Sequence, residues 1–207
     1  MTGSPARTAP ARHSAEGFRL GNEILAFRFV ATLSERRAEP VERLATPERL
    51  RAWLAANELA NELTAGEAAG RAAGEAPVSA ALLEQARELR EAIHRAGTAV
   101  AGGGLPEPAD EELLNRWSAR NRAHLVLSGG RARWRLPQAD PVRAALAVIA
   151  TDAVATLGGD DAIKRCEQPT CGGLFVDTSR GGRRRWCSMA TCGNRMKKAA
   201  IKARASA

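Results

Sequence analysis

The stretch CEQPTCGGLFVDTSRGGRRRWCSMATCGNR, residues 166–195, holds all four cysteines of this 207-residue chain. They form two C-x4-C pairs, Cys166 with Cys171 and Cys187 with Cys192, and fifteen residues separate the pairs. Each pair can supply two thiolate ligands from one tight turn, which suits a single tetrahedral zinc ion. Because four thiolates leave no open coordination position, we expect a structural rather than a catalytic metal.

Disulfides and iron are the alternatives to zinc. The opening residues 1–17 lack the apolar core of a signal peptide, and no run of about 18 apolar residues occurs that could span a membrane. We therefore expect a disordered tail at 1–17 and a cytoplasmic protein with no membrane partner. In that reducing compartment, spaced cysteines are more often metal ligands than disulfides. Iron in a rubredoxin-like site remains a rival, although such sites favour the shorter C-x2-C spacing.

The positive charge of the chain gathers around the cysteines. The formal net charge is +8, and residues 164–207 contain eleven Lys and Arg residues against Glu167 and Asp177. That segment alone carries a net charge of +9, so the remainder is near neutral. A local field of this kind favours a polyanion such as DNA, with RNA as the alternative.

The pattern before the cysteines predicts a mainly helical domain at residues 18–159 with one β-hairpin. Residues 23–35 are dense in apolar residues and fit a helix or a strand, and we favour the helix. Helix starts are indicated at Thr46-Pro47, Ser79, about Asp110 and Asp140-Pro141. The first of these helices carries an apolar stripe that includes Leu50, Trp53, Leu54 and Leu59, and the second should end near Gly97.

Between these helices the composition indicates two breaks and a hairpin. Residues 64–77 read as a mobile loop, residues 101–108 as a break, and residues 125–136 as a hairpin with glycines at its turn. The helix from Pro141 to Leu157 is apolar nearly all round, so we expect it to be the central buried one. Asp152 on that helix marks either a ligand pocket or, more simply, the helix surface.

A small α+β module is expected at residues 160–207, close to the helical domain because few residues link the two. The first cysteine pair forms a knuckle, residues 172–177 a strand, residues 183–186 a returning strand, and residues 189–204 a closing helix. This order is that of a treble-clef zinc finger. The predicted small core consists of Phe175 and Trp186, and Asp177 is expected to pair with a neighbouring arginine.

Residues 164–200 closely resemble the CGNR zinc finger, which is found at the C-terminus of bacterial proteins regarded as stress-induced transcription regulators. The resemblance includes the four cysteines, the Phe-x-Asp-x-Ser stretch, the Arg-Arg-Trp-Cys run and the tetrapeptide at residues 192–195. It implies zinc held by four thiolates, DNA as the partner, and an N-terminal domain of the kind known as ABATE.

The N-terminal resemblance rests on fewer residues. That family usually begins with an apolar stretch containing Asp-Phe-x-Asn-Thr, and here the stretch reads AFRFVAT at residues 26–32. Phe29 and Thr32 are kept, whereas Arg28 stands where Asp is expected and Ala31 where Asn is expected. These departures put any binding role of the two polar residues in doubt.

Phosphate contacts are expected from the basic side chains of the module. On the closing helix, Arg195, Lys198 and Lys202 follow three- and four-residue spacing and share one face, while Met196, Ala199 and Ala200 can turn toward the module. An alternative is that Asn194 and Arg195 bond the backbone of the knuckle. The expected nucleic-acid contacts are Arg183, Arg184, Arg185, Arg195, Lys198 and Lys202.

No arrangement typical of an enzyme occurs in the sequence. There is no phosphate-binding glycine loop, no carboxylate pair and no nucleophile beside a base, and the three histidines are scattered. We predict a DNA-binding transcription regulator whose N-terminal domain senses a small-molecule effector or mediates homodimerisation. The alternatives are an RNA- or ribosome-associated binding protein and a protein–protein adaptor whose zinc only completes the fold.

Overall fold

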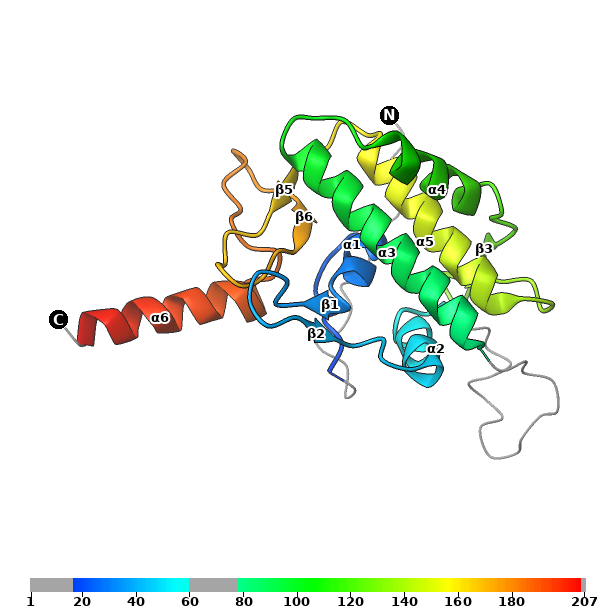
Figure 1. Cartoon of the computed structure of the whole chain (residues 1–207), viewed down its shortest axis with the longest axis horizontal. Coiled ribbons are helices and arrows are strands. Elements are labelled where there is room, and N and C mark those ends of the chain that lie inside the picture. Colours follow the sequence, from blue (N-terminus) through cyan, green and yellow to red (C-terminus); the bar gives the residue numbers. More distant parts are fainter. Residues whose placement is uncertain (1–16, 60–77, 206–207) are drawn as a thin grey trace.

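The computed structural model describes residues 17–59 and 78–205 (Figure 1). The helices are α1 (Leu25–Val30), α2 (Pro47–Ala56), α3 (Ala80–Ala101), α4 (Pro108–Ser118), α5 (Pro141–Leu157), the π-helical turn η2 (Met189–Gly193) and α6 (Asn194–Ala205). The strands are β1 (Leu33–Ser34), β2 (Val41–Glu42), β3 (His124–Ser128), β4 (Arg131–Arg135), β5 (Ile163–Arg165) and β6 (Leu174–Val176). The expected tail (Gly17 apart) and the loop at residues 64–77 lie outside the described residues. The expected class, a mainly α N-terminal domain followed by a small C-terminal finger, is confirmed, although the N-terminal domain has two small hairpins and not the one expected.

Three helices begin at the residues that the sequence indicates. Thr46, Ser79 and Asp140 each accept a hydrogen bond from the backbone N–H three residues further on, at 3.4, 3.1 and 3.1 Å. These side chains satisfy one of the unpaired N–H groups at each helix start. In α2 and α5 the next residue is proline, which needs no such partner. Local sequence therefore sets where these helices begin.

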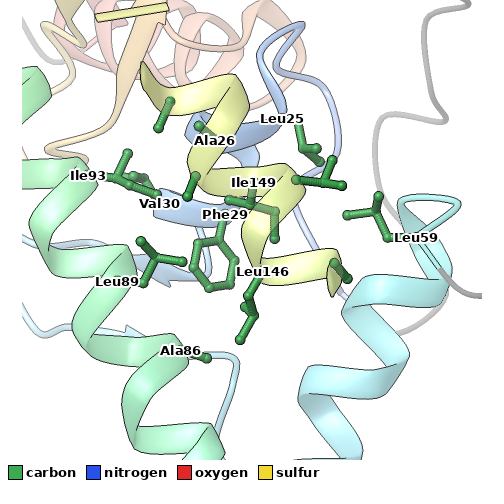
Figure 2. Packing of buried hydrophobic residues seen from close by; sticks show 14 of the residues in the cluster. Leu25, Ala26, Phe29, Val30, Leu59, Ala86, Leu89, Ile93, Leu146 and Ile149 are labelled. Carbon is green, nitrogen blue, oxygen red and sulfur yellow. The ribbon is translucent and has the colours of Figure 1, made fainter. Parts of the chain in front are cut away.

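The core of the helical part forms where α1, α3 and α5 meet. Figure 2 shows Phe29 of α1 between Leu89 of α3 and Leu146 of α5, all of them fully buried. The ring of Trp53 packs against Phe29 with centroids 5.1 Å apart. Helix α5 is buried along most of its length, as its apolar surface predicts. The short α1 is thus held at the centre by longer helices on either side.

Asp152 has neither of the roles that the sequence suggests. Its Oδ2 accepts a hydrogen bond of 2.8 Å from the backbone N–H of Ala26, in the first turn of α1. Ile24, the cap residue of α1, makes no side-chain capping bond. A carboxylate from α5 therefore occupies the positive end of α1 and fixes that helix in the core.

Several boundaries differ from the predictions. The apolar run at residues 23–35 forms the six-residue α1 and then β1, which pairs with β2 in a second small hairpin of the N-terminal part. Two-residue strands are too short to show an alternating pattern. Helix α4 begins at Pro108 instead of Asp110, and Leu59 is buried but lies beyond the end of α2.

Helix α3 continues past Gly97, where the sequence predicts its end, and stops at Ala101. A Cβ atom at Gly97 would lie 2.5 Å from Cδ1 of Leu174 in β6. This glycine is needed because the expected zinc-binding part, residues 160–205, packs directly against the helix. It is a site of close approach and not a helix stop.

The zinc-binding part shares its core with the helices. Ile163, Leu174 and Val176 of the β5–β6 hairpin belong to the same buried cluster as the side chains of α1 and α3. The C-terminal part therefore packs directly against the helical part, as expected. Among the described residues, no helix is both long and apolar enough to cross a membrane.

Residues 183–186 do not form the predicted returning strand, because β6 pairs with β5 instead. The segment makes other bonds. The backbone N–H of Arg184 donates to Asp177 Oδ2 at 3.1 Å, and the carbonyl of Arg185 accepts from the N–H of Glu167 at 3.0 Å. The chain between the hairpin and the second cysteine pair thus lies against the first knuckle.

Candidate zinc centre and basic surface

The four cysteine sulfurs converge on one point. Their Sγ atoms all lie within 4.8 Å of one another, and Cys187 Sγ lies 3.7 Å from the Sγ atoms of both Cys171 and Cys192. Four thiolates about 2.3 Å from a tetrahedral zinc ion lie about 3.8 Å apart. All four cysteines are free, and three of them are buried. The residues therefore fit one structural zinc ion.

The first knuckle is shaped by glycine and by backbone bonds around the sulfurs. The N–H of Gly173 donates to Cys171 Sγ at 3.4 Å, and its carbonyl accepts from the N–H of Cys166 at 2.8 Å. A Cβ at Gly173 would lie 3.2 Å from Cys171 Sγ and 3.5 Å from Cys187 Sγ. Gly172 adopts a left-handed conformation, with φ 66°. Gly173 thus allows the backbone to approach the thiolates closely, and Gly172 supplies the left-handed turn before it.

The second knuckle passes directly into the closing helix. Ser188 caps η2 by accepting a bond from the N–H of Thr191, so Cys187 precedes the helix and Cys192 lies in its first turn, as predicted. Trp186 packs against the cysteine cluster. A Cβ at Gly193 would lie 3.2 Å from the Trp186 ring and 2.5 Å from the sulfur of Met189. The glycine after the fourth cysteine therefore makes room for these two side chains.

Arg184 stabilises the zinc-binding part from within. Its guanidinium donates to the carbonyls of Trp186, Cys187 and Val176 at 3.0, 2.9 and 3.3 Å. It also lies over the ring of Phe175, 4.9 Å from the centroid, and Phe175 is fully buried. Three carbonyls and a ring occupy this arginine, so it is poorly placed to reach a phosphate.

Asp177 pairs with Lys164 and not with the expected arginine side chain. Lys164 Nζ lies 2.7 Å from Asp177 Oδ2, because the antiparallel pairing of β5 with β6 brings the two residues together. The hydrogen bond from Lys164, followed by that from Ser179, holds the pKa of Asp177 well below its usual range. Ser179 also accepts from the N–H of Arg183 at 3.1 Å and so caps the turn.

Glu35 joins the two parts of the chain at a junction that the sequence does not reveal. It accepts hydrogen bonds from Arg19, from Thr170 in the first knuckle, and from Arg195 in α6, the last at 2.6 Å. Its backbone adopts φ 55°, which turns the β1–β2 loop toward the knuckle. Glu35 and its three donors, the Glu35 junction, therefore connect the N-terminal segment, the first knuckle and the closing helix.

Backbone bonds strengthen the same interface. In the β1–β2 loop, the N–H groups of Arg36 and Arg37 donate to the carbonyls of Cys171 and Thr170 at 3.3 and 3.1 Å. His94 Nε2 lies 3.0 Å from the carbonyl of Gly172, and the Asn22 amide donates to the carbonyl of Leu174 at 2.8 Å. No local sequence pattern predicts these contacts, because they connect residues far apart in the chain.

Helix α6 extends away from the body of the molecule (Figure 1). None of its twelve residues is buried, and Ile201 is 68% exposed. Met196 is half-buried, whereas Ala199 and Ala200 are exposed and do not pack against the module as expected. Lys198 and Lys202 are exposed on one face of this helix.

An open hollow of ≈ 440 Å³ lies beside the start of η2. Arg183, Arg185 and Trp186 line it, together with Glu23 of the N-terminal segment. Arg185 lies over the Trp186 ring, 5.0 Å from the centroid, and pairs with Glu167 at 2.5 Å. The hollow and the exposed face of α6 form the basic surface of the zinc-binding part.

Two family models match the chain. The model described as CGNR zinc finger matches residues 162–205, and the ABATE model, described as "Putative stress-induced transcription regulator", matches residues 23–160. The chain belongs to the ABATE family. Neither family is one of enzymes. Comparison with the curated proteins gives no match.

Within the ABATE segment, the two departures from the family pattern contact different parts of the molecule. Arg28 donates to Asn57 Oδ1 at 2.9 Å and so ties α1 to the end of α2. Ala31 lines a cavity of ≈ 30 Å³ beside Cys171 and Cys192. A space of that size holds about one water molecule.

The last two residues of the CGNR motif also differ in role. Asn194 donates to the carbonyl of Ala190 at 3.1 Å, so it bonds the backbone of the second knuckle. Arg195 instead reaches across to Glu35 in the ABATE segment. The segment that matches the ABATE model and the segment that matches the CGNR model are therefore joined by an arginine of the CGNR motif.

Proposed function

We propose that this chain is a cytoplasmic DNA-binding transcription regulator whose CGNR finger contacts DNA. The observation that carries the proposal is the chemistry of α6 and the turn before it: residues 178–207 contain no acidic residue. An exposed basic helix of twelve residues is about 18 Å long. The major groove of DNA admits an α-helix, and the phosphates on its edges attract lysine and arginine.

The six residues expected to contact nucleic acid fall into two groups, those bonded within the protein and those that face solvent or are bonded only at the surface. Arg184 bonds three carbonyls of the finger, and Arg195 bonds Glu35, so both act mainly within the protein. We assign the phosphate contacts to Arg183 and Arg185 at the hollow and to Lys198 and Lys202 on α6. The pair of Arg185 with Glu167 does not exclude this, because Glu167 is 49% exposed and the pair can open to a phosphate, whereas Glu35, the partner of Arg195, is only 16% exposed. Zinc, held by the four thiolates, joins the two knuckles and so fixes the start of α6.

The ABATE segment is proposed to sense a ligand or to mediate dimerisation. Its contacts with the first knuckle and with Arg195 support such a role, because a change in the β1–β2 loop would reach the finger directly. The position of α6 relative to the helices would then depend on the state of this segment.

A salt titration of DNA binding tests the proposal. Zinc-loaded protein is titrated onto a 20-base-pair duplex at several salt concentrations, and Lys198→Ala/Lys202→Ala is compared with wild type. Loss of two phosphate contacts should lower the slope of log affinity against log salt by about two. Arg116→Ala/Arg143→Ala removes the same charge from helices of the ABATE segment and should leave the slope unchanged.

The alternatives give different results in the same assay. An RNA-binding protein would prefer a structured RNA of equal length over the duplex at every salt concentration. An adaptor would bind neither, and charge reversal at residues 183–185 would leave its activity intact. Equal slopes for wild type and the Lys198→Ala/Lys202→Ala variant would refute the assignment of α6.

A further inference from the structure

The helical part of the chain carries a basic cluster of its own, although its overall charge is near neutral. Residues 119–138 contain five arginines and no Asp or Glu. They follow α4 directly and comprise the next loop and the β3–β4 hairpin. In Figure 1 this hairpin lies at the opposite end of the molecule from α6. The cluster is therefore separate from the basic surface of the finger.

The pairing of β3 with β4 places three of these arginines on one face of the hairpin. Arg131, Arg133 and Arg135 alternate along β4, and alternate residues of a strand point to the same face. Trp134, between them, packs against the helical core, and Leu136 is buried. The three arginines thus lie on the face of the strand opposite Trp134. Arg131 and Arg135 are exposed, and Arg133 is half-buried.

Among the described residues, the exposed arginines of this cluster lack the carboxylate partners that other arginines of this part have. Arg36 pairs with Glu91, Arg90 with Glu42 and Arg95 with Asp110, at 2.6, 2.7 and 2.5 Å. Within residues 17–59 and 78–205, Arg122, Arg131 and Arg135 have no such ion pair. The charges of Arg36, Arg90 and Arg95 are thus neutralised within the fold, whereas the exposed arginines without such a pair are available to an external anion.

The geometry of the face fits a nucleic-acid duplex. Arginines on alternate residues of a strand lie about 7 Å apart, so Arg131 and Arg135 span about 14 Å. A two-stranded β-ribbon fits the major groove, which is about 12 Å wide and lined by phosphates. A lipid surface fits less well, because the exposed Leu125 and Leu127 lie on the opposite face of the ribbon from the arginines.

We propose that the arginine face of the β3–β4 hairpin is a second duplex-binding surface, which contacts the phosphate backbone of DNA independently of the finger. Arg122, in the loop before β3, adds a further exposed charge beside this face. The surface provides affinity and no sequence selection of its own, because its contacts are to phosphates. With α6 at the other end, one chain has two separated contacts for DNA.

Binding of full-length, zinc-loaded protein to the 20-base-pair duplex tests this surface. The variant Arg131→Ala/Arg135→Ala should lower the slope of log affinity against log salt by about two, and should weaken binding roughly tenfold at physiological salt. Its matched control is Arg116→Ala/Arg143→Ala, which changes the charge equally and should bind as wild type does. Thermal unfolding of the hairpin variant should stay within a few degrees of wild type, because Arg131 and Arg135 are exposed.

The outcomes separate this proposal from that for the finger. If the hairpin variant keeps the wild-type slope while Lys198→Ala/Lys202→Ala loses two, the hairpin proposal fails and the finger assignment stands. The reverse pattern supports the hairpin and refutes the finger assignment. Vesicles containing 30% phosphatidylserine serve as the competing probe. A hairpin-dependent binding to vesicles stronger than that to DNA overturns the proposal.

Discussion

Replacing Glu35 by glutamine tests whether the Glu35 junction couples the ABATE segment to the finger. Burial by itself raises the pKa of Glu35, but hydrogen bonds from Thr170, Arg19 and Arg195 outweigh this and lower the pKa to about 2. A fall from 4.5 to about 2 corresponds to about 3 kcal/mol. The side chain is 16% exposed, so solvent screening reduces the effect, and we expect a loss of about 2 kcal/mol.

The assay is urea unfolding of zinc-loaded protein at pH 7, followed by tryptophan fluorescence, together with the rate of zinc transfer to a chelating dye. Glu35→Gln should unfold at lower urea and release zinc faster, because Thr170 and Arg195 both lose a charged acceptor. Glu39→Gln is the matched control: it changes the same residue type in the same loop, where the side chain is exposed. An unfolding free energy and a zinc release rate equal to wild type would refute the role of the junction.

The pH dependence has a definite sign. Because folding lowers the pKa of Glu35, its stabilisation is fully present above about pH 4.5 and is lost as the pH falls toward 2. The stability difference between wild type and Glu35→Gln should therefore be constant from pH 5 to pH 8. A difference that grows as the pH falls through that range would contradict the assignment.

Further predictions concern the zinc centre and its docking against the helices. Cys171→Ser should lose zinc and unfold the C-terminal segment, and one zinc per chain retained in native mass spectra would contradict the four-thiolate site. Gly97→Ala should destabilise the protein by about 1–3 kcal/mol in urea unfolding, because its Cβ would lie 2.5 Å from Leu174, whereas Gly104→Ala should cost less. Arg184→Lys should lower the melting temperature of the zinc-loaded protein, because lysine cannot bond three carbonyls in the same geometry; an unchanged melting temperature would refute that role.

Features set by local chemistry were predictable from the sequence. The zinc site follows from cysteine spacing, because each C-x4-C pair closes one turn. The helix starts follow from Thr46, Ser79 and Asp140, whose side chains bond the backbone three residues on. The β3–β4 hairpin follows from two glycines between strand-forming residues, and both of them adopt positive φ.

Features set by distant contacts could not be predicted in this way. Arg195 lies in a basic run, so its charge pointed to phosphate, yet its partner is 160 positions away at Glu35. Asp177 has arginines close by in the sequence, but the register of β5 with β6 selects Lys164. Gly97 resembles a helix end, and only the docked Leu174 explains it. In each case the deciding residue belongs to another element.

The net charge of the helical part does not show that basic residues are clustered within it. The net charge of the helical part is near zero because its carboxylates are numerous, and that sum hides the five arginines of residues 119–138. Pairing in space is what separates arginines that stabilise the fold from those that face solvent. The strand alternation in β4 could have revealed the arginine face from the sequence alone.

The most direct test of the central claim, that the finger brings this protein to DNA, is mapping of bound DNA across the genome in cells, with RNA recovered from the same pull-down. We predict enrichment at a small number of promoters, which Lys198→Ala/Lys202→Ala abolishes while Arg116→Ala/Arg143→Ala preserves it. Recovery of ribosomal RNA without promoter enrichment would contradict the account.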